Sequence, residues 1–331
     1  VLGGRRVDHR GDSLHRRRLD RGVTQLVQDA LRLEEVMRYH ERTKHHFARF
    51  AAGPGRLDWA NQPSPFRRFQ GAPLTRLPLL APDDEPRPPA YDRLYAPGAV
   101  PSAPVGLRAL SRLLEYALAL TAWKQAGGTR WALRANPSSG NLHPTEGYVF
   151  ISSIRELGES PGLFHYAPLE HGLERRADCP PELFARLVRG LPPQAFLVGL
   201  SSVHWREAWK YGERAFRYCQ HDVGHAIGAV RIAAAALGWS GLVLDGVADG
   251  TIDALLGLDR IADFEGAERE SAELVMAVSP GEAATRTSSL DEKAVQELKR
   301  QRWYGKANRL SLDDPVRWDA IDDVAAASRK G

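Results

Sequence analysis

Residues that could do chemistry are concentrated in two segments of the 331-residue chain. The first runs from Arg134 to Glu146 and reads RANPSSGNLHPTE. Its Ser, Gly and Asn residues tolerate tight or left-handed backbone and offer N–H and hydroxyl donors. A planar ligand could lie against the backbone at Gly140, and Arg134 adds a forked cation suited to phosphate or carboxylate. A polar connection from a helix to a strand would have the same composition, so the residues alone leave both interpretations open.

The second segment, Lys210 to His225, has helical spacing and carries titratable side chains at its start. Lys210 and Tyr211 could move a proton, provided that the lysine loses its charge before it acts as a base. Asp222 and His225 are three residues apart and share one helical face. A solvated lysine beside a packed tyrosine, and a structural Asp–His hydrogen bond, would explain the same residues without catalysis.

Other catalytic motifs are missing from the sequence. It contains no Gly-x-Gly-x-x-Gly after a predicted strand, no Gly-x-x-x-x-Gly-Lys-[Ser/Thr] loop and no Gly-x-Ser-x-Gly elbow. Cys179 and Cys219 form neither a disulfide framework nor a zinc pattern, and His40, His45 and His46 lack metal-site spacing. We therefore expect no metal site and a reducing, cytoplasmic location.

The positive charge of the chain is concentrated at its start. The formal net charge is +4, and residues 1–22 hold seven Arg and three Asp, so residues 23–331 are balanced at 38 basic and 38 acidic residues. A neutral globular part argues against binding to nucleic acid, and residues 1–22 are predicted to be a basic, disordered arm. No apolar run is long enough to predict a membrane span, and no secretory signal is indicated.

Apolar spacing predicts the elements that position these motifs. A helix is expected over 23–37, another from Leu107 to Thr121 that stops before Gly127, and one continuous helix over 207–237. Residues 53–104 hold 12 of the 22 prolines, which predicts an extended arm held by its aromatic residues, or a flexible linker near 83–89. The remaining expected elements are strands at 147–154, 195–200, 241–244 and 274–278, a hairpin from residue 162, and short helices at 181–189, 249–256, 291–300 and 319–328.

Both chemical segments resemble one family. The first is similar to the R-x-x-P-S-[AS]-G-x-L-[YH]-P-x-E signature of the SagB/ThcOx-type dehydrogenases, a branch of the FMN-dependent nitroreductase superfamily. The second resembles the K-Y-x-x-R-x-x-R-Y…D-x-G-H helix of the same family. The resemblance covers about residues 105–281 and, more weakly, 36–72. It implies an α+β, nitroreductase-like fold with a central, mostly antiparallel sheet flanked by helices, one of them long and central.

The resemblance also implies a set of site residues. Lys210 and Tyr211 would be catalytic, removing a proton as hydride leaves the substrate. FMN would bind through the signature loop and through a backbone approach after the long helix, with its phosphate held near the N-terminus by a stretch similar to the family's Arg-Arg-Ser-x-Arg. The residues implied to bind the cofactor are Arg42, Thr43, Lys44, Arg134, Pro137, Ser138, Ser139, Gly140, Asn141, Gly241 and Leu242.

The implied activity is an FMN-dependent oxidation, with an azoline ring in a modified peptide as the substrate and an azole as the product. Two alternatives remain: an NAD(P)H-dependent nitro or quinone reductase, and a non-catalytic binding protein with the same fold. Family members bind FMN in a groove between two subunits, and this chain carries one set of motifs, so a homodimer or a second nitroreductase-like half is expected. The predicted division is an arm at 1–22, a helix at 23–52, the Pro-rich arm at 53–104, the FMN core at 105–285 and a helical extension at 286–331.

Overall fold

The computed structural model describes residues 9–96, 98–281 and 289–331, with side chains described from residue 25 onward. These residues form two compact units. One consists of the N-terminal segment up to Ala51 together with Asp319–Arg329, and the other of Ala52–Trp318 with Lys330–Gly331. This grouping by contacts does not test the predicted functional division at 105 and 285, which stays a prediction.

The smaller unit is a pair of helices, α1 (His9–Thr43) and α8 (Asp319–Ser328). Arg32 on α1 donates to the carbonyl of Ala327 on α8 at 3.0 Å. The helices expected at 23–37 and 319–328 are present, but the prediction of a disordered arm is wrong for residues 9–22, which continue α1. This stretch contains no proline, so its backbone can continue the helix. Residues 1–8 of the predicted arm lie outside the described residues.

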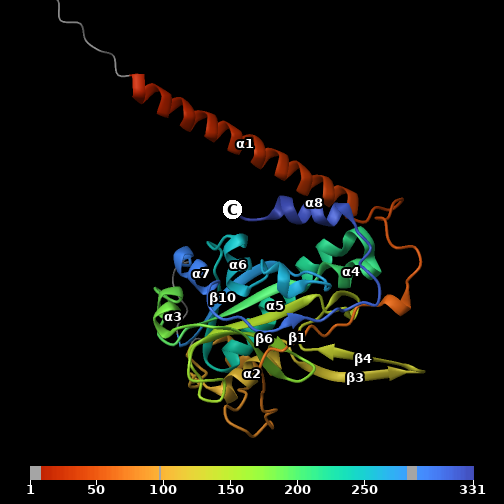
Figure 1. Ribbon diagram of the computed structural model, residues 1–331. Helices are drawn as coiled ribbons and strands as arrows, with labels where there is room; N and C mark the ends of the chain where they lie inside the picture. The colour runs from red at the N-terminus through yellow and green to blue at the C-terminus, as the bar shows by residue number, and fades with distance from the viewer. Residues whose placement is uncertain (1–8, 97, 282–288) are drawn as a thin grey trace, which may run out of the picture. The chain divides into compact units, whose positions relative to one another are not determined.

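The larger unit is built on a seven-stranded sheet with the order β2-β7-β6-β5-β8-β10-β9 (Figure 1). Every strand pairing described in this sheet is antiparallel. The implied α+β fold with a mostly antiparallel central sheet is therefore confirmed. The strands are β2 (Leu74–Arg76), β5 (Thr145–Ile151), β6 (Gly162–Ala167), β7 (Gly172–Asp178), β8 (Phe196–Ser202), β9 (Trp239–Val243) and β10 (Ser271–Pro280).

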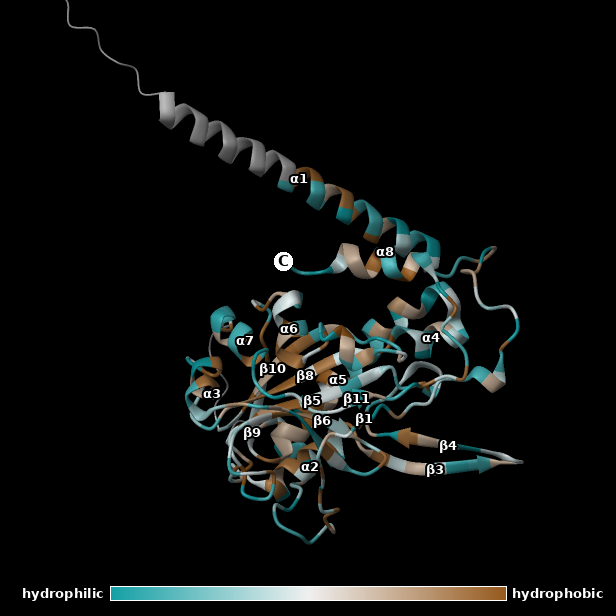
Figure 2. Cartoon of the chain, in the orientation of Figure 1, coloured by the Kyte–Doolittle hydropathy of each residue, from teal (hydrophilic) through white to brown (hydrophobic). Residues whose placement is uncertain are grey.

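Both faces of this sheet are buried, because successive side chains of each central strand enter different cores. In β5, Val149 and Ile151 face a core with α2 (Leu107–Ala117) and α5 (Ala215–Ala236), while Tyr148 and Phe150 face the opposite one. That second core includes side chains of α3 (Pro181–Leu187), α6 (Asp249–Leu256) and α7 (Glu292–Leu298). Figure 2 shows the resulting hydrophobic colouring of the central strands.

Two helix predictions in this unit are wrong. The helix expected to run from Leu107 to Thr121 ends at Ala117, and the chain then forms a two-stranded hairpin, β3 (Leu120–Ala126) and β4 (Thr129–Arg134). Most of β3 is exposed, so its sequence lacks the alternation of apolar and polar residues that would have predicted a strand.

The continuous helix predicted over 207–237 is interrupted. It is divided into α4 (His204–Tyr211), a 3-10 turn (Gly212–Arg214) and α5. Gly212 has a φ of 53°, and a Cβ there would lie 2.7 Å from the carbonyl oxygen of Ala52. The close backbone approach of residue 52 requires glycine at this position, and the left-handed conformation ends the first helix.

The Pro-rich arm contributes elements to the same unit. Besides β2 it forms β1 (Phe69–Gln70), which pairs with β11 (Lys306–Ala307), and two 3-10 turns, Trp59–Asn61 and Tyr91–Tyr95. Its aromatic residues differ in their packing. Trp59 lies edge-on to Trp209 with ring centroids 5.2 Å apart, whereas Tyr91 and Tyr95 are exposed and contact each other.

Candidate functional site

The signature segment connects β4 to β5 through a strained loop. Gly140, Asn141 and His143 have φ values of 59°, 61° and 53°, and residues 139–141 form a short 3-10 turn. Left-handed backbone at non-glycine residues costs of order 1–3 kcal/mol each and persists only where the surroundings hold it. The Asn141 amide donates to the carbonyl of Ala132 at 2.8 Å and accepts from His143 Nε2 at 3.0 Å. Burial, with Arg134 adding to it, lowers the pKa of His143 to about 3, so this imidazole is neutral.

Asp222 fixes the loop to the long helix. This fully buried carboxylate on α5 accepts the backbone N–H of Ser139 at 2.9 Å and its hydroxyl at the same distance. Burial raises the pKa of Asp222, although the hydrogen bonds from Ser139 oppose that shift. His225 lies 3.9 Å from this carboxylate. The two sequence segments are thus joined by a buried carboxylate, a role for Asp222 that its place in the D-x-G-H motif did not reveal.

The start of the second segment meets the same loop at Gly140. A Cβ on Gly140 would lie 2.5 Å from the hydroxyl oxygen of Tyr211 and 3.0 Å from Lys210 Nζ. Both side chains are half-buried, and Lys210 Nζ is 5.4 Å from the centre of the Tyr211 ring. Burial raises the pKa of Tyr211, and Glu207, Tyr218 and Asp222 add to that effect. The structure therefore brings together three residues that the sequence singled out, at a point where only a glycine leaves room for them.

Arg134, at the end of β4, faces the protein interior. Its side chain is 8% exposed and donates to the carbonyl oxygens of Thr145, at 3.3 Å, and Pro65. Burial lowers the pKa of Arg134 to about 10, with Arg206 contributing and Glu146 opposing. These contacts hold the two ends of the loop together. The predicted contact of Arg134 with FMN stays a prediction.

Glu146, the last residue of the signature, is part of a buried chain of charges. It accepts from Arg206 at 2.5 Å and lies 3.1 Å from His165, which is itself 3.0 Å from Glu174. Burial lowers the pKa of His165, but its two carboxylate partners outweigh burial and raise it to about 9. Glu174 in turn accepts from Arg68 at 2.6 Å. The final glutamate of the motif thus ties the loop to the sheet.

The other implied cofactor residues are placed as follows. Pro137 is exposed, and Ser138 accepts the N–H of His143 at 2.7 Å. Gly241 and Leu242 lie on β9, where a Cβ on Gly241 would be 3.5 Å from Arg231 on α5. Arg231 is nine residues after Asp222, about 13 Å along the helix. A ligand that touched both the loop and β9 would therefore have to extend along α5.

The implied phosphate-binding residues belong to the smaller unit, at the end of α1. Thr43 donates its hydroxyl to the carbonyl of Tyr39 at 2.8 Å, and Lys44 pairs with Glu41 at 2.5 Å. Arg42 precedes them in the last turn of α1. Their assignment to phosphate stays a prediction.

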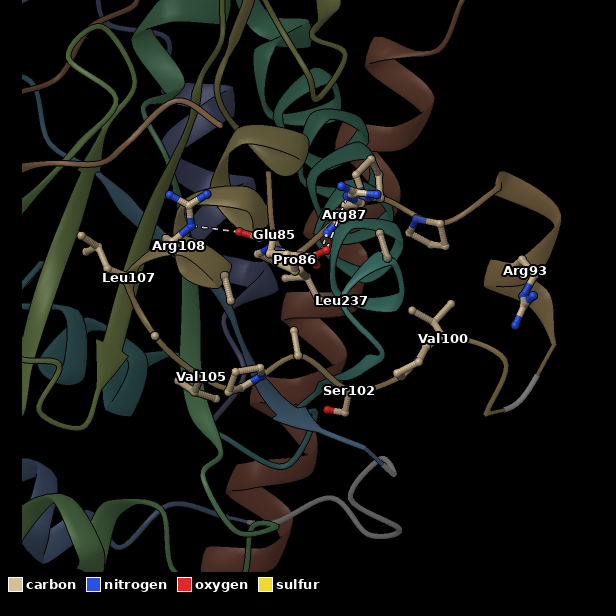
Figure 3. A pocket seen from close by; sticks show the side chains of 18 of the residues that line it. Glu85, Pro86, Arg87, Arg93, Val100, Ser102, Val105, Leu107, Arg108 and Leu237 are labelled. Carbon is tan, nitrogen blue, oxygen red and sulfur yellow. Dashed lines mark hydrogen bonds and ion pairs between the residues drawn. The ribbon is translucent and has the colours of Figure 1, made fainter. Parts of the chain in front are cut away.

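The larger unit contains a cavity of about 840 Å³ (Figure 3). It is lined by the Pro-rich arm, the start of α2 and the end of α5, and it shares no residue with the signature loop or the Lys210–Tyr211 segment. Within the part of the chain that the structure describes, no group of three or more potential ligands could hold a metal ion, and no helix is long and apolar enough to cross a membrane.

Comparisons with known proteins agree with this fold. The family model "Nitroreductase family" matches residues 102–278. A protein of Methanocaldococcus jannaschii whose name places it among the nitroreductases is 29% identical over 143 residues, covering 41% of this chain and 67% of its own.

Among solved structures, one from Anabaena variabilis, also described as a nitroreductase, has a TM-score of 0.54 at 22% identity, covering 89% of this chain and 63% of its own. The chain thus spans less than two thirds of that protein. An Escherichia coli microcin synthetase complex with truncated pro-microcin bound has a TM-score of 0.42 at 20% identity, covering 63% of this chain and 79% of its own. Because the family model spans more than half of the 331 residues, the chain belongs to the nitroreductase family.

Proposed function

We propose that this chain is an FMN-dependent oxidoreductase of the SagB/ThcOx type that oxidises azoline rings in modified peptides to azoles. The observation that carries the proposal is the convergence of Lys210 Nζ and the Tyr211 hydroxyl on Gly140. A proton-transferring pair is useful only beside a bound reactant, and Gly140 is the exposed, side-chain-free point of the loop. The family resemblance of both segments supports the same assignment.

The exposed surface at Gly140 fits a flat flavin ring, whereas two of the polar side chains nearby already have partners within the protein. Pro137 and Gly140 are exposed and present little side-chain bulk, which suits a flat ring. The amide of Asn141 and the guanidinium of Arg134 are engaged within the protein, so they would act by shaping the loop. When bound, FMN would supply a hydride acceptor, which amino-acid side chains do not provide.

The protein's own part in such an oxidation is positioning and proton transfer. Lys210 and Tyr211 would take the proton that the azoline ring loses as it becomes aromatic. Asp222 would keep the loop in place through Ser139, so that Gly140 stays next to Lys210 and Tyr211. The buried position of Asp222 limits exchange of this anchor with water.

The first test is the absorbance spectrum of the purified chain with and without added FMN. A flavin spectrum that survives desalting is expected, and a protein that stays colourless would favour a non-catalytic binding protein. Azoline-containing peptides and, separately, NAD(P)H with nitroaromatic compounds then distinguish the two enzymatic functions. Turnover of NAD(P)H with nitroaromatics alone would favour the general reductase.

Substitution of Gly140 by leucine is expected to abolish FMN binding. The new side chain would need the space of Tyr211 and Lys210 and would adopt a φ of 59°, which is unfavourable for leucine. Gly127→Leu is the matched control, because Gly127 has a similar φ of 56° but nothing within 4 Å of its Cβ position. FMN titration of both folded variants checks the prediction, and equal affinity of the two would remove Gly140 from the cofactor site.

A second nitroreductase-like unit is expected to complete the site, as a homodimer or as a second half of the same fold. The described chain has one signature loop and one Lys210–Tyr211 pair, so it would supply half of a shared groove. Sedimentation of the FMN-loaded protein checks this expectation, and a dimer is the expected species. A monomer that keeps tightly bound FMN would contradict the shared groove.

A further inference from the structure

Glu207 is a buried carboxyl group without a hydrogen-bond partner among the residues that the structure describes. It lies on α4 with none of its surface exposed, and neither of its carboxyl oxygens has a partner among the described residues. It is three residues before Lys210 and four before Tyr211, so all three share one face of the helix. Burying an unpaired charge is costly, and such a group therefore tends to keep its proton.

The charged and titratable groups that act on Glu207 come from two elements. Lys210 and Tyr211 share its own helix, and Asp222 and Cys219 lie on α5, which packs against α4. Burial raises the pKa of Glu207 to about 9, Asp222 adds to that shift, and Lys210 opposes it.

Asp222 and Glu207 are a pair of buried carboxyls in unequal surroundings. Asp222 accepts the backbone N–H and the hydroxyl of Ser139, which favour its charged form, whereas neither carboxyl oxygen of Glu207 accepts a hydrogen bond from the described residues. Where two environments differ in this way, one carboxyl stays ionised and the other stays protonated. The space beneath the signature loop then carries one negative charge, on Asp222.

We propose that Glu207 is a positioning residue of the Lys210–Tyr211 site and that it acts by staying uncharged. The proposal rests on the function proposed above. An ionised Glu207 would place a second negative charge beside Asp222 and weaken the anchor to Ser139. It would also attract Lys210, one turn away, and draw its Nζ from Gly140. The neutral acid leaves both contacts in place.

The first test needs no cofactor. Between about pH 4.5 and 9 the folded protein would hold a proton on Glu207 that the unfolded chain releases, so this group makes the wild type less stable as pH rises through that window. Glu207→Gln keeps the shape and cannot ionise. The melting temperature of E207Q minus that of the wild type should therefore grow steadily from pH 5 to pH 9. Glu159→Gln, at an exposed glutamate, should show a constant difference.

The second test joins Glu207 to the site. FMN titrations from pH 6 to pH 10 should show that the wild type loses affinity as Glu207 ionises near pH 9, and that this alkaline loss is absent in E207Q. Infrared spectra at pH 7 should contain a protonated-carboxyl band in the wild type that E207Q lacks. A missing band together with a pH-independent stability difference would show that Glu207 is ionised and would overturn the proposal. An alkaline loss of affinity that persists in E207Q would also overturn it.

Failure of the proposed function and failure of the role of Glu207 would give different results. If neither protein binds FMN at any pH, the proposed function fails, while the melting and infrared measurements still report the charge of Glu207. If both bind FMN and the melting difference is flat, the function stands and the role of Glu207 fails.

Discussion

Replacing Lys210 with alanine, or Tyr211 with phenylalanine, is expected to leave FMN binding in place and to lower substrate oxidation by about 10²–10⁴-fold, the range for loss of general acid–base catalysis. Each change removes the one polar group that its side chain brings to Gly140. The loop itself keeps its anchor, because Asp222 holds Ser139 independently of both residues. Steady-state rates with an azoline peptide, measured on variants with confirmed flavin content, check the prediction.

The controls for this pair use the same substitutions at two half-buried positions elsewhere in the fold. Lys299 pairs with Asp259 at 2.7 Å, and the Tyr304 hydroxyl donates to Asp178 at 2.7 Å, both outside the candidate site. Lys299→Ala and Tyr304→Phe should retain the wild-type rate within about twofold, as expected of groups that take no part in the acid–base step. A wild-type rate in Lys210→Ala or Tyr211→Phe would show that the corresponding residue serves packing alone.

Arg206→Met is expected to destabilise the fold by about 3–5 kcal/mol, the usual cost of removing one partner of a buried ion pair. Arg206 is fully buried and donates to Glu146, to the carbonyl of His143 at 2.8 Å and to that of Ser64 at 2.9 Å. Its loss removes a direct ion-pair partner of the buried Glu146, which keeps its contact with His165. Because domains are stable by about 5–15 kcal/mol, this one change would remove a large part of the total. Denaturant unfolding followed by circular dichroism measures the difference.

The matched control is Arg186→Met. Arg186 also pairs with two carboxylates, Asp291 and Glu297, but its side chain is 32% exposed and water can replace the contacts. A surface pair of this kind contributes about 0–1 kcal/mol, so the control should unfold close to the wild type. Equal losses of unfolding free energy in the two variants would show that burial does not increase the contribution of the Arg206 contacts to stability.

Much of the sheet and several helices were predictable from the sequence, because both faces of the strands are covered and the apolar runs are therefore nearly continuous. Strands β5, β8 and β10 overlap their predicted ranges for this reason. Helix α6 also lies at its predicted range, 249–256. The hairpin of β3 and β4 was missed because its exposed strand lacks an apolar alternation. The break at Gly212 was missed because it depends on residue 52, which is 160 positions away.

The sequence predicted which residue types form the candidate site, but not the hydrogen bonds and packing that hold them together. The signature indicated a ligand-binding loop, and the Lys-Tyr segment indicated a proton-transferring pair. The structure brings Gly140, Lys210 and Tyr211 together. The anchoring role of Asp222 and the burial of Glu207 depend on how α4 and α5 pack, which helical spacing does not determine. The inward direction of Arg134 likewise depends on the carbonyl oxygens of Pro65 and Thr145.

The pairing of β1 with β11 has a consequence for how the chain reaches its native state. Phe69 pairs with Ala307, and Arg67 donates to the carbonyl of Asn308 at 2.5 Å, so these particular contacts form only when residues beyond 300 are present. Contacts so distant in sequence close late, since the entropy of the intervening loop must be overcome first. During synthesis β1 would therefore stay unpaired with β11 until most of the chain has left the ribosome, although Phe69 can already pack against Tyr148 and His165. Unwanted association with other chains is possible during this interval, which ends when β11 pairs with β1.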